Sequence, residues 1–232
     1  MTGPTTYRRT SLAEVRTKRR TMSLGTAREA IGPVTHGCEI YGLTMGQFSL
    51  IDIIEHCLGA SGPADVTLST WTAAGADMDF ALKLMSMGAI RSMRFVVDFS
   101  FPRRQPAYCD ALRQRFGDAA IRVTKTHAKF VTILNAEWQI AIRSSMNLNE
   151  NRRLESFEIS DDAGMVEYLH EVVDALFAEH APGEQFDASP GKNMRDFETL
   201  ARVGEQRTMF GDGATDIDLR RAGWTTERGG RL

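Results

Sequence analysis

The order of hydrophobic and polar positions along the chain predicts helices that alternate with strands. Residues 46–59 repeat apolar side chains at the spacing of one helix face, and Gly59 is placed to end that helix. Residues 64–73 alternate apolar and polar positions, as a half-buried strand does. A second helix is predicted over 76–90. The strand predicted over 91–101 has consecutive apolar residues, which favours a central place in its sheet.

The second half of the pattern contains more strands than helices. A helix is predicted over 105–116 and closed by Gly117, and the last helix is predicted over 161–180, after acidic residues that suit a helix N-terminus. Between them the pattern predicts two or three strands over 120–145, with a tight turn at Asn135 and Ala136, and one further strand over 155–160.

Helices that alternate with strands favour a parallel sheet covered on both faces, because right-handed crossovers place helices there. The adjacent strands on either side of the turn at Asn135 predict one antiparallel hairpin within that sheet. We therefore expect an α/β fold over residues 33–180. Its form is a three-layer α-β-α sandwich with a mostly parallel mixed sheet.

Charge and composition change on either side of that range. Residues 1–30 carry seven Lys and Arg side chains against two Glu, although the whole chain has a net charge of -2. The densest part of this basic arm, assigned to residues 1–32, contains Arg16, Lys18, Arg19 and Arg20. Such an arm suits a polyanion such as nucleic acid, and it is equally compatible with a solvated terminus. Residues 181–232 are rich in Gly, Asp and Arg without a sustained apolar period, which predicts an extended or disordered tail.

Three cysteines, Cys38, Cys57 and Cys109, form no C-x-x-C pair, which favours free, buried thiols in a reducing compartment. His56 and Cys57 are metal-type ligands, but adjacent residues on a helix point roughly 100° apart and share an ion poorly. Core packing is therefore the better interpretation, and no metal or cofactor is predicted.

No apolar run approaches the ~18 residues that a membrane span needs, and the basic N-terminus is not followed by the apolar core of a secretory signal. The expectation is a cytoplasmic protein that does not contact membranes.

Candidate chemistry is concentrated between residues 127 and 155. His127 and Lys129 are two apart at the start of an apolar run, so on a strand they would project from one face. Ser145 and Asn147 follow the next predicted strand, and Glu155 opens the one after it. A phosphodiester repels nucleophiles through its negative oxygens, so a site for it must supply both a nucleophile and compensating donors or positive charge. These residue types supply both.

This arrangement resembles the HKD signature of the phospholipase D superfamily: H-x-K, then S-x-N, then a glutamate before another apolar strand. The resemblance covers about residues 40–180. It implies that His127 attacks phosphorus and forms a phosphohistidine, that Lys129 and Asn147 hold the non-bridging oxygens with help from Ser145, and that Glu155 accepts a hydrogen bond from the His127 ring. It also implies that no metal is needed, and that a chain with a single motif pairs as a homodimer so that a second histidine completes the site.

Two positions depart from the family pattern. Leu134 stands where the family has an acidic residue, and Ser144 stands where it has glycine. Two functional classes therefore remain. One is a phosphodiesterase, best matched to a nuclease of the phospholipase D type. The other is a non-catalytic nucleic-acid-binding or assembly protein with the same fold. Arg143, Arg152 and Arg153 suit the backbone of nucleic acid, preferably DNA, in either class, or are simply solvated.

Overall fold

The computed structural model describes residues 25–148, 153–184 and 186. Seven strands form one sheet within these ranges: β1 (Glu39–Thr44), β2 (Ala64–Thr70), β3 (Ile90–Asp98), β4 (Ile121–Thr124), β5 (Phe130–Leu134), β6 (Gln139–Ser144) and β7 (Glu155–Asp161). The helices are α1 (Ala27–Ile31), α2 (Leu50–Ser61), α3 (Gly75–Ser86), α4 (Phe101–Arg104), α5 (Pro106–Phe116) and α6 (Ala163–Glu179), with a 3₁₀ turn at Asp118–Ala120.

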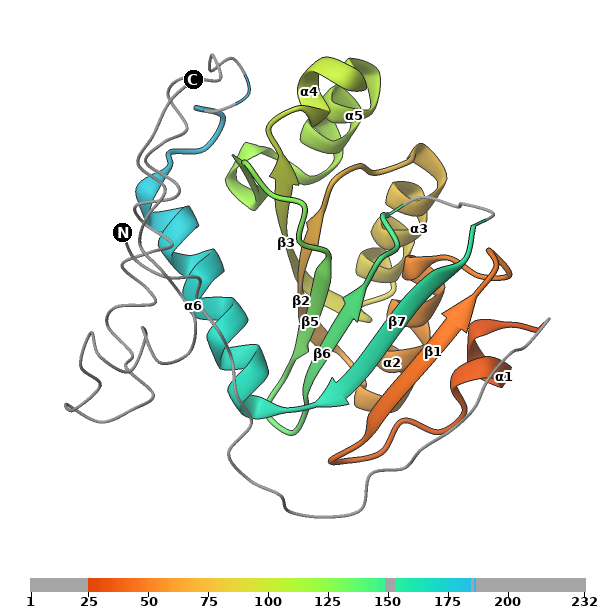
Figure 1. The fold of residues 1–232 in the computed structure, drawn as a ribbon. Coiled ribbons are helices and arrows are strands. Elements are labelled where there is room, and N and C mark those ends of the chain that lie inside the picture. Colours follow the sequence, from red (N-terminus) through yellow and green to blue (C-terminus); the bar gives the residue numbers. More distant parts are fainter. Residues whose placement is uncertain (1–24, 149–152, 185, 187–232) are drawn as a thin grey trace, which may run out of the picture.

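The sheet has the order β1-β7-β6-β5-β2-β3-β4 (Figure 1). Among the strands, β2 pairs with β3 and β3 with β4 in parallel, and the pairs β1–β7, β7–β6, β6–β5 and β5–β2 are antiparallel. Five described strands thus run in one direction, and β5 and β7 run in the other. The α/β fold and the mixed sheet are confirmed. Antiparallel pairing extends well beyond the single hairpin that the sequence predicted, because β1 joins β7 and β5 joins β2.

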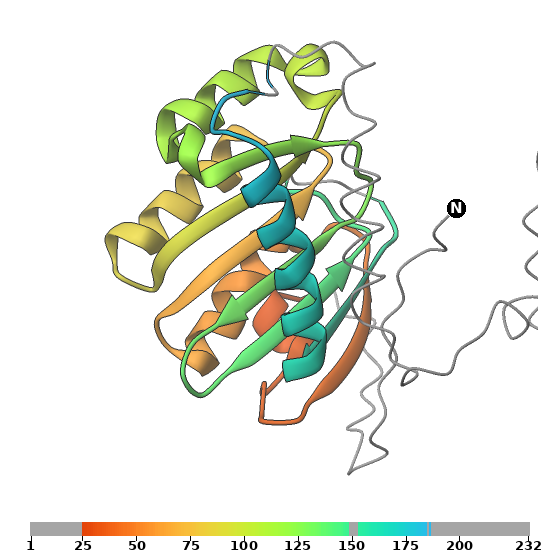
Figure 2. The ribbon, with the colours of Figure 1, turned by 90° about the vertical axis from the view of Figure 1, so that its left-hand side faces the viewer.

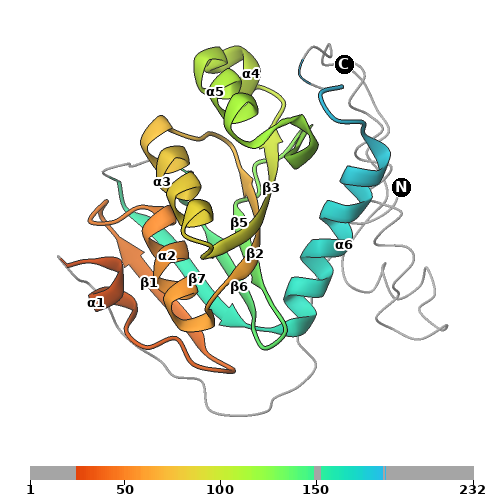
Figure 3. The same ribbon diagram turned by 180° about the vertical axis from the view of Figure 1, so that it is seen from behind.

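Helices cover both faces of this sheet, as the three-layer expectation required. Seen from behind, α2 and α3 lie over one face (Figure 3), and the large hydrophobic core fills the space beneath them. The opposite face is crossed by α6 (Figure 2). Two smaller clusters lie under α6, in which Met165 and Leu169 pack with Ala141 of β6, and Val173 packs with Val96 of β3.

The first predicted helix begins at Leu50 rather than at residue 46, and it ends later than the sequence indicated. The prediction placed its end at Gly59, but α2 continues to Ser61, and Gly62 with φ 73° forms the C-cap. The N–H of Gly62 donates to the carbonyl of Leu58, which closes the last turn. Gly59 is an exposed position inside the helix, so the true end is marked by the residue whose backbone adopts the left-handed conformation.

Two N-terminal elements have no counterpart among the predictions. The first is α1, which begins with a capping box of Thr26 and Glu29 and contributes Ala30 and Ile31 to the large core. Residues 27–31 therefore pack with the domain, although they were grouped with the basic arm. The second is β1, the edge strand, whose Gly42 lies opposite Phe157 of β7.

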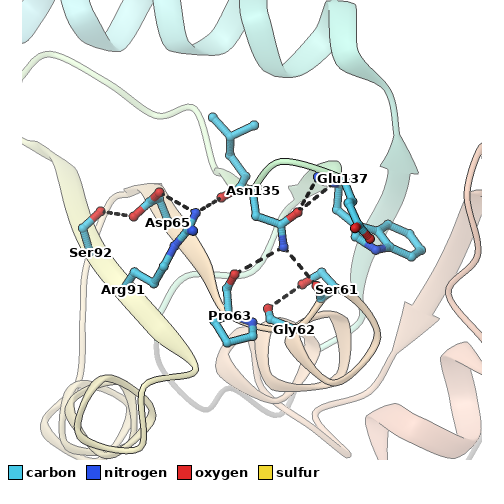
Figure 4. A network of polar contacts seen from close by, with 10 residues as sticks. Ser61, Gly62, Pro63, Asp65, Arg91, Ser92, Asn135 and Glu137 are labelled. Carbon is cyan, nitrogen blue, oxygen red and sulfur yellow. Dashed lines mark hydrogen bonds and ion pairs between the residues drawn. The ribbon is translucent and has the colours of Figure 1, made fainter.

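A polar network ties together the sheet edge at the amino ends of β2 and β3 (Figure 4). Asn135, in the turn between β5 and β6, donates from Nδ2 to the carbonyls of Ser61 (2.9 Å) and Pro63 (3.2 Å), and its Oδ1 accepts from the N–H groups of Glu137 and Trp138. The predicted turn is thus present. Its first residue also fastens the turn to the end of α2.

Some predictions concern residues outside the described ranges, namely most of the basic arm (residues 1–24) and the tail beyond Phe186. None of the helices in the described ranges is both long and apolar enough to cross a membrane. All three cysteines are buried free thiols.

Candidate active site

The directions of the strands bring the candidate residues to the side of the sheet where most strands have their carboxyl ends. This side is the upper edge of the sheet in Figure 1. β2, β3, β4 and β6 end there, and β5 and β7 begin there, as the pairings Ser69 with Phe130 and Ser144 with Phe157 require. Ligand sites of open α/β sheets form at the carboxyl ends of such strands. The three motif segments therefore meet although 28 residues separate His127 from Glu155.

His127 and Lys129 lie on an extended segment just before β5, not within a strand as predicted. Side-chain and backbone donors hold this segment in place: Ser69 Oγ donates to the carbonyl of Ala128, and the N–H of Ser144 donates to the carbonyl of Lys129. Strand pairing begins only at Phe130. The two side chains still project together, and Lys129 Nζ lies 3.4 Å from His127 Nδ1.

Lys129 is partly buried, with its amino group also 3.2 Å from the carbonyl oxygen of His127. Burial lowers the pKa of Lys129, while the negative charge of Glu155 acts in the opposite direction and raises it. The motif glutamate therefore favours the charged form of the motif lysine. A positive charge held beside a histidine is the electrostatic setting that a phosphate group requires.

Glu155 differs from its predicted role. Its Oε2 accepts a hydrogen bond from Ser145 Oγ, and Ser145 Oγ in turn accepts from the N–H of Ser156 at 2.9 Å. The predicted hydrogen bond between Glu155 and the His127 ring is not formed in this structure, and the hydrogen-bond partner of the carboxylate is Ser145. Glu155 thus orients the serine and influences Lys129 through its charge.

Asn147 lies beside the end of β2, where its Oδ1 accepts from the N–H of Trp71 at 3.2 Å. A backbone N–H can bond only to the oxygen of the amide, so this contact fixes which way the side chain is turned. The Asn147 Nδ2 group then faces away from Trp71. It is an amide donor, the type of group that holds a phosphoryl oxygen.

A buried carboxylate supports the histidine segment from the end of β3. Asp98, which is 5% exposed, accepts from the N–H of Thr126 at 3.3 Å, and its other oxygen accepts from the N–H and the hydroxyl of Ser100. Thr126 directly precedes His127. Asp98 therefore links the histidine segment to the start of α4.

Trp71 and Arg104 adjoin this site and were not among the predicted site residues. The Trp71 and His127 rings are 5.9 Å apart, and the guanidinium carbon of Arg104 lies 3.5 Å from the centroid of the Trp71 ring. Trp71 follows the end of β2, and Arg104 ends the short helix after β3. The position of each just beyond a strand that ends at this edge was the available signal in the sequence.

Of the residues predicted to contact nucleic acid, Arg143 and Arg153 lie within the described ranges. Arg143 forms an ion pair with Glu158, and Arg153 is exposed. Arg152, together with Arg16, Lys18, Arg19 and Arg20 of the arm, lies outside the described residues.

The other four histidines of the chain lie elsewhere. His36 stacks on Trp138 and contacts Asp161, and His56 bonds to the carbonyl of Gly32. His170 bonds to Thr132, and His180 caps the end of α6. His127 is therefore the one histidine at this edge. Within the described ranges, no cluster of three or more His, Cys, Asp or Glu side chains is arranged to hold a metal ion.

Leu134 lies at the opposite end of β5 from the candidate site. It pairs with Gln139 across the β5–β6 hairpin and packs against the cluster under α6. Its departure from the family pattern therefore alters the packing at the far edge of the sheet and removes no group from the neighbourhood of His127.

A hollow of about 690 Å³ between α1 and α2 is lined by Arg28, Glu55 and His56 among others. It contains none of the five motif residues. The candidate chemistry is on the sheet edge rather than in this hollow.

No protein-family model matches the sequence, and no curated protein does. Three solved structures are similar to the chain at low identity. Polyphosphate kinase from Porphyromonas gingivalis is 18% identical with a TM-score of 0.46 over 62% of this chain and 27% of the kinase. NucT from Helicobacter pylori is 12% identical with a TM-score of 0.45 over 60% of this chain and 96% of NucT. Phosphatidylserine synthase from Haemophilus influenzae is 12% identical with a TM-score of 0.44 over 72% of this chain and 45% of the synthase. The chain thus spans about a quarter of the kinase and less than half of the synthase.

Proposed function

We propose that this protein is a phosphodiesterase that cleaves nucleic acid without a metal ion, through a phosphohistidine intermediate in a homodimer. The observation that carries the proposal is the convergence of the motif residues. Lys129 lies within 3.4 Å of the His127 ring, and Ser145, Asn147 and Glu155 arrive at the same sheet edge from two other strands. This set combines the nucleophile His127, the positive charge of Lys129, which the nearby Glu155 favours, and the amide donor of Asn147.

The proposed first step forms a bond between a ring nitrogen of His127 and phosphorus while the bond from phosphorus to the leaving oxygen breaks. Lys129 and the Nδ2 group of Asn147 stabilise the non-bridging oxygens, whose negative charge must be balanced in the transition state. In the second step water attacks phosphorus and the bond between nitrogen and phosphorus breaks. The products are a phosphomonoester and the free histidine.

A proton must reach the leaving oxygen in the first step, and a proton must leave the attacking water in the second. Both transfers suit an imidazole. The four remaining histidines of this chain are engaged at other places in the fold. His127 of the partner subunit is the proposed acid and base, which is why the active species is a homodimer.

The alternative is a protein that binds nucleic acid at this edge without cleaving it. The positions of Trp71 near His127 and of Arg104 on the Trp71 ring are compatible with it, because a stacked aromatic ring and a guanidinium suit nucleic acid whether or not cleavage occurs. The two functions differ in whether a covalent intermediate forms.

The test is to trap that intermediate. Purified protein is mixed with 5′-labelled and 3′-labelled single-stranded DNA in EDTA, quenched and separated under denaturing conditions. We expect one of the labels to become attached to the protein through a linkage that is stable in alkali and labile in acid, as a phosphoramidate is. His127→Asn should lose both the adduct and the cleavage.

His56→Asn is the matched control, because His56 bonds to Gly32 on the far side of the fold. It should retain the adduct. Binding of DNA without adduct or cleavage over a range of salt and pH would instead establish the alternative.

A further inference from the structure

Arg104 is positioned differently from most arginines of the described chain. Arg91, Arg94, Arg113, Arg115 and Arg143 each form a salt bridge with a carboxylate. Arg104 is exposed and forms no salt bridge within the described residues; Nε donates to Ser100 Oγ and Nη2 to the carbonyl of Trp71, both at 2.9 Å. Burial lowers the pKa of Arg104, and the charge of Asp98, which accepts from the Ser100 hydroxyl, acts in the opposite direction. Within the described residues its Nη1 group has no hydrogen-bond partner.

The indole of Trp71 holds this guanidinium in place. The guanidinium carbon lies 3.5 Å from the centroid of the indole ring, within the range of a strong cation–π contact. The carbonyl contact and the bond to Ser100 fix the same group from two further directions. Such anchoring lowers the entropy that the side chain loses when it binds a ligand.

The same indole adjoins His127, at 5.9 Å between the rings. An anion bound to Arg104 therefore lies one aromatic ring away from the proposed nucleophile. A polynucleotide carries a phosphate at every nucleotide, so a strand with one phosphate at His127 presents the next phosphate to its surroundings.

From these contacts we propose that Arg104, held by Trp71, binds the phosphate next to the scissile one and makes this a site for a continuous polynucleotide strand. The proposal rests on the proposed function for its substrate class. It assigns Arg104 as a substrate-binding residue and Trp71 as the residue that positions it. A substrate with a single isolated phosphate would use His127 and Lys129 but leave Arg104 without a ligand.

Salt dependence tests the phosphate contact, because each phosphate neutralised on a single strand contributes about 0.7 to the slope of log affinity against log salt. Binding of a fluorescein-labelled oligothymidylate is measured by anisotropy over a series of salt concentrations. All proteins carry His127→Asn, so no cleavage interferes. Arg104→Gln should weaken binding and make the negative slope shallower by about 0.7.

Two Trp71 variants test the positioning role. Trp71→Ala should lower the slope as Arg104→Gln does, and the double variant should lower it no further, since both changes remove the same contact. Trp71→Phe keeps an aromatic face and should retain the slope. Arg91→Gln, at the opposite edge of the sheet, should leave the slope unchanged.

An unchanged slope for Arg104→Gln overturns the proposal, whether affinity falls or not, because loss of affinity alone indicates only a structural effect. A lack of any binding by the reference protein also overturns it. Cleavage by the protein with native His127 is measured separately. If the protein does not cleave nucleic acid, the proposed phosphodiesterase activity is refuted. A salt slope that depends on Arg104 would still support the phosphate contact of Arg104.

Discussion

The carboxylate of Asp98, at the end of β3, accepts a hydrogen bond from the N–H of Thr126, the residue before His127. This contact joins the end of β3 to the segment between β4 and β5, and the Asp98 carboxylate is almost closed to solvent. The place of the histidine is therefore set by a residue that does not itself face the substrate.

Replacing Asp98 with Asn should disturb both stability and the site. One carboxylate oxygen of Asp98 accepts from the N–H of Ser100 and the other from the N–H of Thr126. Because an amide has only one acceptor oxygen, one of these N–H groups loses its partner in Asp98→Asn, at a cost of about 1–3 kcal/mol in the free energy of unfolding. Urea unfolding measures this loss, and the rate of adduct formation should fall as well. Asp110→Asn, exposed on α5, is the control and should change neither.

The charge of Lys129 predicts the alkaline limit of activity. In the proposed mechanism the protonated amine holds phosphate. Burial lowers its pKa below the ordinary value of 10.5, so activity should fall with rising pH earlier than for an exposed lysine. Glu155 raises this pKa, so Glu155→Gln should move the alkaline limb of kcat/KM to lower pH. Lys129→Arg should abolish that limb because arginine stays protonated. If the alkaline limb of kcat/KM stays at the same pH in Glu155→Gln, Glu155 does not raise the pKa of Lys129.

Gly42 and Phe157 predict a large difference between two Gly→Ala substitutions. A Cβ on Gly42 would meet the Phe157 ring atoms Cε1 and Cε2 at 2.6 and 2.9 Å, so Gly42→Ala should destabilise by about 1–3 kcal/mol. A Cβ on Gly59, inside α2, meets nothing within 4 Å, and Gly59→Ala should stabilise by about 0.5–1 kcal/mol. Thermal unfolding of both variants compares the two; equal effects would exclude the close approach of β1 and β7.

The Asn135 network predicts that one side chain stabilises the far edge of the sheet. Asn135→Ala removes its two donated and two accepted hydrogen bonds and should cost about 2 kcal/mol in urea unfolding. Glu137→Ala, two residues away with an exposed side chain, should cost little because its backbone N–H remains. The DNA affinity of Asn135→Ala should match that of the parent, since this edge is opposite the candidate site.

The three thiols should be nearly inert in the folded protein. Burial raises the pKa of all three, that of Cys109 to about 11, so very little thiolate exists at neutral pH. A thiol reagent at pH 8 should modify native protein slowly and label three residues per chain in denaturant. Rapid labelling of one residue in the native state would show that its burial is not maintained.

Long helices with one repeated apolar face could be predicted from the sequence. A very short helix, and a strand with apolar residues on both faces, could not. The helices near 50–61 and 163–179 follow from repeated apolar spacing, because each must bury one face. β1 was missed because apolar residues alternate onto both of its faces: Ile40 is buried against the core while Tyr41 and Leu43 are exposed. Helix α1, with five residues, is too short to show a period.

The site was predictable only in part. The spacing H-x-K and S-x-N identified residues that the strands do bring together. The partner of Glu155 was not predictable, because it depends on Ser145 reaching the carboxylate across the β6–β7 pair. Arg104 and Trp71 are 33 residues apart, and no local pattern indicates that the guanidinium at the end of α4 will stack on a ring that follows β2.

The pairing of β1 with β7 has a consequence for the order in which the protein is made. A ribosome releases residues 39–44 long before residues 155–161, and within the described sheet β7 is the sole neighbour of β1. A nascent chain therefore holds β1 without its partner while residues 45–154 are synthesised, with Tyr41 and Leu43 on an open strand edge. Contacts between such distant segments form slowly. The window before β7 emerges is thus when this protein most needs protection from aggregation.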